Sequence, residues 1–159
     1  MTNQSASHVS AGDREIVIAR VVDAPRDLVW EAFTRPEHVA QWWGPNGFTN
    51  TIHEMDVRPG GVWRFIMHGP DGTDYPNRVD YVEVVKPERL VYMIRDDRED
   101  ASEHFTATIR FEERAGGTEV TLRMLFPTAD EYKRSVDFGA IEGGNQTLDR
   151  LNEYLKAMR

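Results

Sequence analysis

The sequence predicts an α+β domain in which a curved antiparallel sheet of about seven strands wraps round a long C-terminal helix. Over residues 49–126, apolar and polar side chains alternate with the period of two that half-buried strands show. After that segment, Leu148, Leu151 and Leu155 recur at the spacing of one apolar helix stripe. Two short helices after the first strand complete an order that is typical of α+β domains.

The first strand is predicted over Glu15–Val22, where β-branched residues dominate. A helix follows, with Asp23 as the expected N-terminal cap and Pro25 in its first turn. It ends before Pro36, because a proline disfavours helical backbone in the residue that precedes it. A second short helix is predicted over Pro36–Gln41, before a loop rich in glycine and proline.

Six further strands follow, separated by short stretches of turn-forming residues. They are predicted over Thr49–Val57, Val62–His68, Asn77–Val85, Arg89–Arg95, His104–Phe111 and Thr118–Phe126. Connections this short join antiparallel neighbours, and a long sheet of this kind twists and curls.

One long helix is then predicted after Pro127, with Thr128 or Asp130 as its cap. Three glycines weaken its middle and indicate a kink or a close approach to the sheet: Gly139, Gly143 and Gly144.

Length and composition predict one domain. The chain has 159 residues, and we expect residues 14–159 to form a single core after a disordered polar lead-in over residues 1–13. The lead-in has no apolar stretch, so it does not resemble a signal peptide. No apolar run approaches the roughly 18 residues that a membrane span needs, and the sequence predicts a cytoplasmic location.

Charge and motifs argue against several classes of function. Acidic residues outnumber basic ones by 27 to 19, for a net charge of −8, which argues against nucleic-acid binding. Cysteine is absent, so disulfides and thiolate chemistry are excluded. Zinc-ligand spacings, nucleophile elbows and phosphate-binding glycine loops are also absent from the sequence, so neither a metal nor a cofactor is predicted.

Apolar side chains that share one face of several strands predict a ligand cavity between the sheet and the last helix. Trp63, Phe65 and Met67, for example, alternate on one strand and so point the same way. A sheet that curls round a helix leaves space at its wide end, and such spaces hold apolar ligands. The expected ligand-binding residues are Trp43, Phe48, Trp63, Phe65, Met67, Tyr81, Tyr92, Phe105, Phe126, Phe138 and Ile141. The alternative is that these side chains simply fill the core.

Trp42 and Trp43 stand side by side at the start of a Gly/Pro loop. Two adjacent tryptophans cannot easily both point inward, and tryptophan is rarely buried completely. We expect one of them to fill the core and the other to line the mouth of the pocket.

His53 and Glu54 are the candidates for acid–base chemistry. Histidine changes its charge near neutral pH, and a strand carboxylate that faces an apolar pocket could act as an acid or a base. His68, on the neighbouring strand, is expected on the face opposite Trp63 and Met67.

A succession of short motifs resembles the SRPBCC superfamily. In chain order they are Val29-Trp30, Ala32-Phe33-Thr34, Pro36-Glu37, Trp42-Trp43-Gly44-Pro45, Arg58-Pro59-Gly60-Gly61, Lys86-Pro87-Glu88-Arg89-Leu90, Gly116-Gly117-Thr118 and Gln146-Thr147-Leu148-Asp149-Arg150-Leu151. Within the superfamily, nearly the whole chain is similar to bacterial homologues of the activator of the ninety-kilodalton heat-shock-protein ATPase. The resemblance implies the helix-grip fold of the birch pollen allergen and the START lipid-transfer domains, with a deep cavity between sheet and helix. Many members bind hydrophobic ligands.

The chain departs from the family pattern at Asn145, which follows Gly144 where many relatives have tryptophan. The resemblance therefore implies a roomier or more polar cavity at this point. No catalytic residue of the family can be transferred to this chain.

Three functions are compatible with these features. The leading hypothesis is binding of a small hydrophobic or amphipathic ligand, such as a lipid, a polyketide or an aromatic compound, without catalysis. The second is a cyclase- or hydrolase-type enzyme that uses His53, Glu54 or a pocket tyrosine. The third, implied by the resemblance, is a stress-response co-chaperone that stimulates a heat-shock-protein ATPase. The sequence leaves both a homodimer and contact with a chaperone open.

Overall fold

The structure is a computed structural model that describes residues 8–9, 14–98, 101 and 103–158. Its elements are β1 (His8–Val9), β2 (Glu15–Val22), α1 (Arg26–Thr34), α2 (Pro36–Trp42), β3 (Thr49–Met55), β4 (Val62–His68), β5 (Asp74–Val85), β6 (Arg89–Asp96), β7 (Glu103–Arg114), β8 (Gly117–Leu125), α3 (Ala129–Asp137) and α4 (Ala140–Met158). The predicted lead-in over residues 1–13 lies outside the described residues, except for the two residues of β1, which pair with β2.

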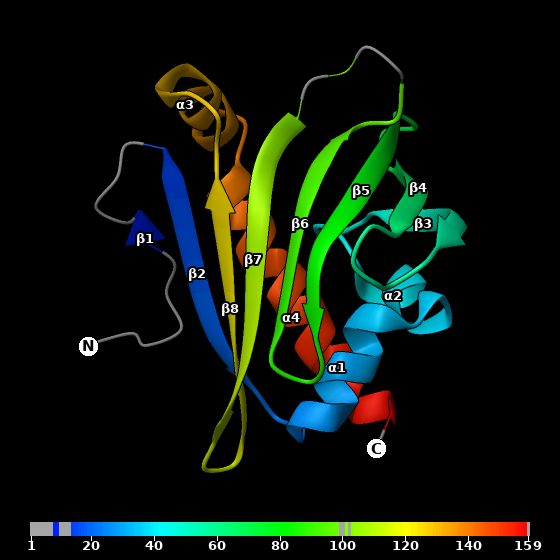
Figure 1. Cartoon of the computed structure of the whole chain (residues 1–159), viewed down its shortest axis with the longest axis vertical. Coiled ribbons are helices and arrows are strands. Elements are labelled where there is room, and N and C mark those ends of the chain that lie inside the picture. The colour runs from blue at the N-terminus through cyan, green and yellow to red at the C-terminus, as the bar shows by residue number, and fades with distance from the viewer. Residues whose placement is uncertain (1–7, 10–13, 99–100, 102, 159) are drawn as a thin grey trace.

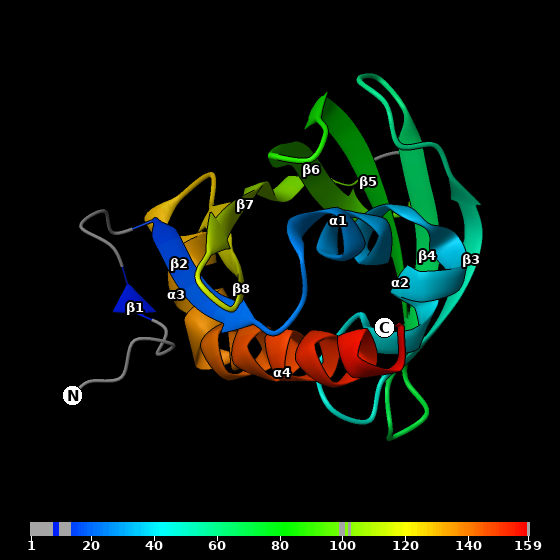
Figure 2. The same cartoon turned by 90° about the horizontal axis from the view of Figure 1, so that it is seen from below.

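The strands form one antiparallel sheet in the order β1-β2-β8-β7-β6-β5-β4-β3 (Figure 1). β3 to β8 follow one another as a meander, and β2 returns to pair with β8, from Glu15 opposite Leu125 to Val22 opposite Thr118. Seen from below, the sheet curves round α1, and α4 lies across the open side of the curve (Figure 2). The predicted α+β helix-grip architecture is therefore confirmed, with seven long strands and the short β1.

The C-terminal segment forms two helices rather than the single long helix that the sequence predicts. α3 and α4 are separated at Gly139, whose φ of 97° lies in the left-handed region that favours glycine. The Thr128 hydroxyl accepts a hydrogen bond from the Glu131 amide at 3.1 Å, so Thr128 is the cap of α3. Asp23 is not the cap of α1, since that position belongs to Pro25, which has no capping side chain.

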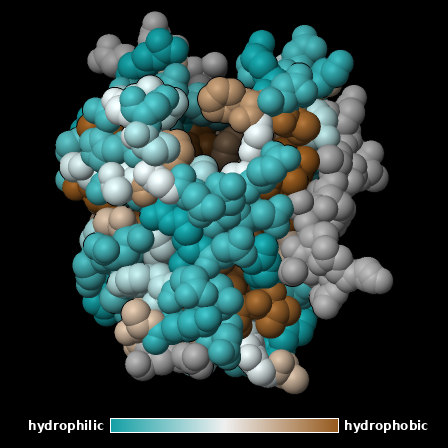
Figure 3. Space-filling model, turned by 180° about the vertical axis from the view of Figure 1, so that it is seen from behind, coloured by the Kyte–Doolittle hydropathy of each residue, from teal (hydrophilic) through white to brown (hydrophobic). Residues whose placement is uncertain are grey.

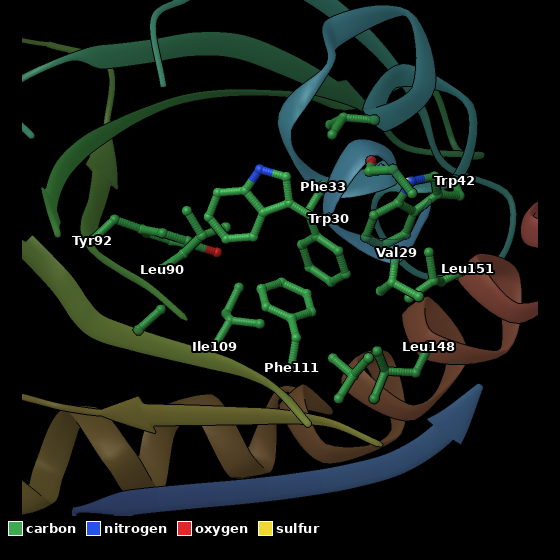
Figure 4. Packing of buried hydrophobic residues seen from close by; sticks show 14 of the residues in the cluster. Val29, Trp30, Phe33, Trp42, Leu90, Tyr92, Ile109, Phe111, Leu148 and Leu151 are labelled. Atoms are coloured by element: carbon green, nitrogen blue, oxygen red, sulfur yellow. Dashed lines mark hydrogen bonds between the residues drawn. The ribbon is translucent and has the colours of Figure 1, made fainter. Parts of the chain in front are cut away.

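The core lies inside the curve of the sheet. Figure 4 shows Trp30 and Phe33 of α1 beside Phe111 of β7, with Leu148 and Leu151 of α4 close by. The ring centroids of Trp30 and Phe33 lie 5.6 and 5.0 Å from that of Phe111, in edge-to-face geometry that adds about 0.5–1.5 kcal/mol per pair beyond burial. Both leucines are fully buried, which confirms the predicted apolar stripe of the last helix.

Two adjacent glycines of α4 differ in their surroundings and provide a matched test of packing. A Cβ on Gly143 would lie 3.4 Å from the Pro45 ring, an ordinary contact, whereas a Cβ on Gly144 would overlap the Cδ1 atom of Ile18. We expect Gly143→Ala to stabilise the protein by about 0.5–1 kcal/mol, because alanine is the better helix former. Gly144→Ala should be about 1 kcal/mol or more less stable than Gly143→Ala, since the buried Ile18 must move.

Urea unfolding of both variants checks this expectation. Equal stability of the two variants would show that α4 does not approach β2 as closely as the structure describes.

Candidate functional site

An apolar cavity of about 130 Å³ lies between the inner faces of β6, β7 and β8 and the N-terminal half of α4. Its walls are Trp43, Tyr92, Ile94, Phe105, Ala107, Ile109, Leu122, Arg123, Met124, Ala140, Gly144 and Thr147. Ala107 of β7 and Gly144 of α4 both border the cavity, and each has almost no side chain. This leaves the space between the two elements unfilled. Viewed from behind, the mainly hydrophilic surface is hollowed at one place, where hydrophobic residues line the recess (Figure 3).

Few polar groups border the cavity. Tyr92 is 4% exposed, and burial raises the pKa of its phenol, so the hydroxyl stays neutral and able to donate a hydrogen bond. The Thr147 hydroxyl donates to the Gly143 carbonyl at 2.8 Å and keeps acceptor capacity. Arg123 alternates with inward-facing neighbours and forms an ion pair with Glu15, so its charge faces away from the cavity.

The lining of the cavity is mainly apolar. Among the described residues that form the walls, none is a histidine, an aspartate or a glutamate. The walls offer an apolar surface with two hydroxyl groups, an arrangement that can hold and orient an apolar ligand by burial and one or two hydrogen bonds.

Trp43 closes one side of the cavity from the loop between α2 and β3. Its ring packs edge-on against Trp42 and Trp63, with centroid separations of 5.5 and 5.2 Å. Trp42 is 1% exposed, and Trp43 is only partly buried. The prediction that one tryptophan fills the core and the other lines the pocket is confirmed.

Arg150 of α4 holds this loop in place. Its Nη1 donates to the carbonyls of Trp43, Gly44 and Pro45 at 3.2, 2.9 and 2.8 Å, and its Nη2 donates to those of Phe48 and Gln41 at 3.0 and 3.5 Å. Burial lowers the pKa of this guanidinium, because partial removal from water disfavours its charged form. Sequence reasoning did not assign Arg150 a role, because a single basic residue on a helix carries no signal of its distant partners.

The structure separates the predicted ligand-binding residues into several groups. Trp43, Tyr92 and Phe105 line the cavity. The side chains of Trp63, Phe65, Tyr81 and Phe126 are buried in the core, where they fill space, and Met67 and Ile141 pack against that core partly buried. Phe48 is half-buried, with its ring 6.0 Å from that of Tyr75. For Trp63, Phe65, Tyr81 and Phe126, the alternative expectation that the side chains simply fill the core describes the structure better.

The placement of Phe138 in the pocket is wrong. Its side chain is 86% exposed, at the junction of α3 and α4. The prediction assumed one continuous helix, and the break at Gly139 turns this residue outward.

The placement of His53 and Glu54 in an apolar pocket is also wrong. Both are exposed, at a β-bulge of β3 on the far edge of the sheet, and the Glu54 carboxylate lies 3.7 Å from the Arg64 guanidinium. The bulge shifts the register at this point, which strict alternation along the strand does not anticipate. His68 lies on the outer face as predicted, between the Thr51 hydroxyl at 2.7 Å and the Asp74 carboxylate at 2.8 Å.

Asn145 does not shape the cavity. Its side chain donates to the Ile141 carbonyl at 3.0 Å and accepts from Arg20 at 3.2 Å, outside the cavity walls. The implied enlargement of the cavity at this position is therefore not found. The room comes instead from Ala107 and Gly144.

Within the described part of the chain, no group of three or more metal-ligating side chains is close enough to hold an ion. Among the described helices, none is long and apolar enough to cross a membrane.

Comparisons with known proteins agree with this architecture. Residues 23–156 match the family model described as "Activator of Hsp90 ATPase homolog 1-like protein". Protein Ms6760 from Mycobacterium smegmatis is 25% identical, with a TM-score of 0.87 over 96% of this chain and 98% of that one. Protein NE0264 from Nitrosomonas europaea is 27% identical, with a TM-score of 0.82 over 94% and 98% of the two chains.

A third solved structure supports the fold alone. The protein from Arthrobacter aurescens is 20% identical, with a TM-score of 0.87 over 96% of this chain and 91% of that one. Among proteins with curated functions, none matches the chain significantly.

Proposed function

Since the chain belongs to the activator of Hsp90 ATPase homolog 1-like family, whose fold commonly binds hydrophobic ligands, we propose that it binds a small apolar or amphipathic molecule in the cavity between the sheet and α4. The observation that carries the proposal is the apolar cavity of about 130 Å³ with hydroxyl groups of Tyr92 and Thr147 in its walls. Burial of apolar ligand surface supplies the affinity, and the hydroxyls set the orientation.

The cavity volume narrows the ligand class. An engineered protein cavity of about 150 Å³ holds benzene, whereas pockets for drug-sized ligands measure roughly 300–1,000 Å³. At about 130 Å³ this cavity matches a single aromatic ring or a short alkyl segment. We therefore propose a single-ring aromatic compound, with an attached polar group, as the ligand; a multi-ring polyketide or a whole acyl chain exceeds the available space.

The alternative functions have weaker support. The enzyme hypothesis named His53, Glu54 or a pocket tyrosine. His53 and Glu54 lie exposed at a β-bulge away from the cavity, and Tyr92, which lines the cavity, has a pKa that burial raises, so its phenol stays neutral and is a poor base. The co-chaperone hypothesis needs a large exposed apolar patch. The large apolar residues exposed within the described chain are spread over β2, β5, β6, β8 and the α3–α4 junction: Val21, Tyr75, Val82, Met93, Leu125 and Phe138.

Filling the cavity tests the proposal. The probe is p-cresol, which carries one ring and one hydroxyl, and the measurement is thermal unfolding with and without it. At about 100 times its Kd, such a ligand should raise Tm by about 5–10 °C. Ala107→Phe places a ring in the cavity and should remove this shift. Thr108→Phe, the next position on β7 but on the outer face, is the matched control and should keep it.

Mass spectrometry of compounds released from the purified, denatured protein gives an independent readout, and a stoichiometric single-ring compound is the expected finding. An unchanged p-cresol response in Ala107→Phe would place binding elsewhere. A panel of single-ring compounds without any response would contradict the proposed ligand class.

A further inference from the structure

Three arginines stand directly opposite one another on the outer face of the sheet. Arg64 of β4 is paired in register with Arg78 of β5, and Arg78 is paired with Arg95 of β6. Their strand neighbours Trp63 and Val79 are buried in the core, so the three guanidinium groups lie on the face away from the apolar cavity. We call Arg64, Arg78 and Arg95 the arginine row.

The arginine row borders a hollow of about 440 Å³, which Asp97 and Arg98 complete. The arginine side chains are 43%, 33% and 27% exposed, from Arg64 to Arg95, so they are held against the sheet rather than extended into solvent. Of the five residues that line the hollow, four are cationic, in a chain whose net charge is −8. Each of the four arginines also lies within ion-pair distance of a carboxylate, so the hollow concentrates guanidinium groups rather than net positive charge.

Three carboxylates pair with the row and orient it: Asp97, Asp80 and Glu54. Asp97 accepts from Arg64 Nε at 3.0 Å, and Asp80 accepts from Arg78 Nε and Nη2 at 3.2 and 3.1 Å. Arg95 Nε reaches the same Asp80 only at 3.5 Å. The Glu54 carboxylate stands farther off, at 3.7 Å from Arg64, so the three arginines have three carboxylate partners.

This arrangement is unfavourable for the folded protein taken alone. Like charges directly opposite one another across two strands destabilise a sheet, and here the repulsion occurs twice in succession. A neutral residue at the central position 78 would relieve both contacts. Sites that bind ligands often cost a protein some stability.

The hydrogen-bonding geometry of arginine indicates which class of ligand would fit this hollow. The planar guanidinium donates pairs of parallel hydrogen bonds that fit phosphate oxygens, and several such groups converge where a compact, multiply charged anion is held. We propose that the arginine row and its hollow bind the phosphate or diphosphate group of a small soluble molecule. This site is separate from the apolar cavity, and its occupation does not depend on the proposed aromatic ligand.

Isothermal titration with sodium pyrophosphate, the probe for this chemistry, tests the proposal on the full chain. We expect one equivalent to bind, more weakly as NaCl is raised, because salt screens exposed charges. Arg78→Gln should weaken binding about tenfold or more, since it removes charge-assisted hydrogen bonds from the centre of the row. Arg95→Gln should act in the same direction, and Arg78→Lys should weaken binding less than Arg78→Gln does.

Arg110→Gln is the matched control. Arg110 also lies on the outer face opposite another arginine, Arg89, but it does not border the hollow. Its replacement should change the pyrophosphate affinity by no more than about twofold. Thermal unfolding supplies a second readout: pyrophosphate should raise the Tm of the unsubstituted protein more than that of Arg78→Gln, whereas without anions Arg78→Gln should change Tm little, because the repulsion that is lost is accompanied by the loss of two hydrogen bonds to Asp80.

The outcomes separate the possibilities. Absence of pyrophosphate binding, or equal weakening of binding by Arg78→Gln and Arg110→Gln, would overturn the proposal. Co-sedimentation with phosphatidylglycerol vesicles distinguishes a lipid surface from a soluble ligand. Binding to these vesicles without a response to pyrophosphate would also overturn it.

Discussion

Replacing Trp42 by alanine is expected to lower the free energy of unfolding by about 3–5 kcal/mol. The side chain is 1% exposed, and its ring lies 4.8 Å from that of Phe33 in edge-to-face contact. Its Nε1 also donates to the Ala32 carbonyl at 3.0 Å. The substitution therefore leaves a large cavity at the centre of the core and removes a buried hydrogen bond, two effects that add to each other.

Trp43→Ala is the matched control for this variant, since it makes the same chemical change one residue further along. Trp43 is only partly buried and borders an existing cavity, so its loss should cost less than half as much as the loss of Trp42. Urea unfolding followed by fluorescence measures both values. Equal losses would mean that the two tryptophans do not have the separate roles that the structure assigns to them.

Replacing Arg150 by methionine is expected to destabilise the protein by about 2–3 kcal/mol, because hydrogen bonds to charged groups contribute more than neutral ones. Methionine keeps the length of the side chain and removes its donors. Arg150 contacts five carbonyls between Gln41 and Phe48, and four of these contacts are 3.2 Å or shorter. Without the guanidinium, the loop that carries Trp43 loses its main attachment to α4.

The same variant should weaken p-cresol binding, since Trp43 forms one wall of the cavity. Urea unfolding and the thermal shift with p-cresol measure the two effects. Lys156→Met is the control, because Lys156 also lies on α4 and its Nζ forms an ion pair with the exposed Glu153 at 2.9 Å. A loss of stability in Arg150→Met no larger than in Lys156→Met would contradict the role of Arg150.

The sequence alone was sufficient for the architecture. Strand periodicity of two and the leucine stripe of α4 are local patterns, and each reports directly which face of an element is buried. The exceptions are instructive. The glycines indicated a kink in the last helix but not the full break at Gly139, and the bulge between Ile52 and Glu54 has no clear local signature; each shifts the direction of nearby side chains.

The candidate site was predicted less well. Alternation correctly placed Phe105 and Ala107 on the inner face of β7, but the prediction favoured large aromatic residues as ligand contacts. In the structure most of these aromatics fill space, as Trp63 and Phe65 do by stacking with ring centroids 4.1 Å apart. The cavity lies instead where small residues meet, at Ala107 and Gly144.

By itself, then, the sequence determined the α+β class, the antiparallel sheet and the buried face of most elements, and it predicted that Trp42 and Trp43 would differ in burial without indicating which of them is buried. Only the tertiary structure decided where the cavity lies, that Arg150 holds the loop beside it, and that Arg64, Arg78 and Arg95 form one row. The reason is physical. Burial follows from the repeat of residues along one element, whereas cavities and charge clusters depend on the register between elements that are distant in the chain.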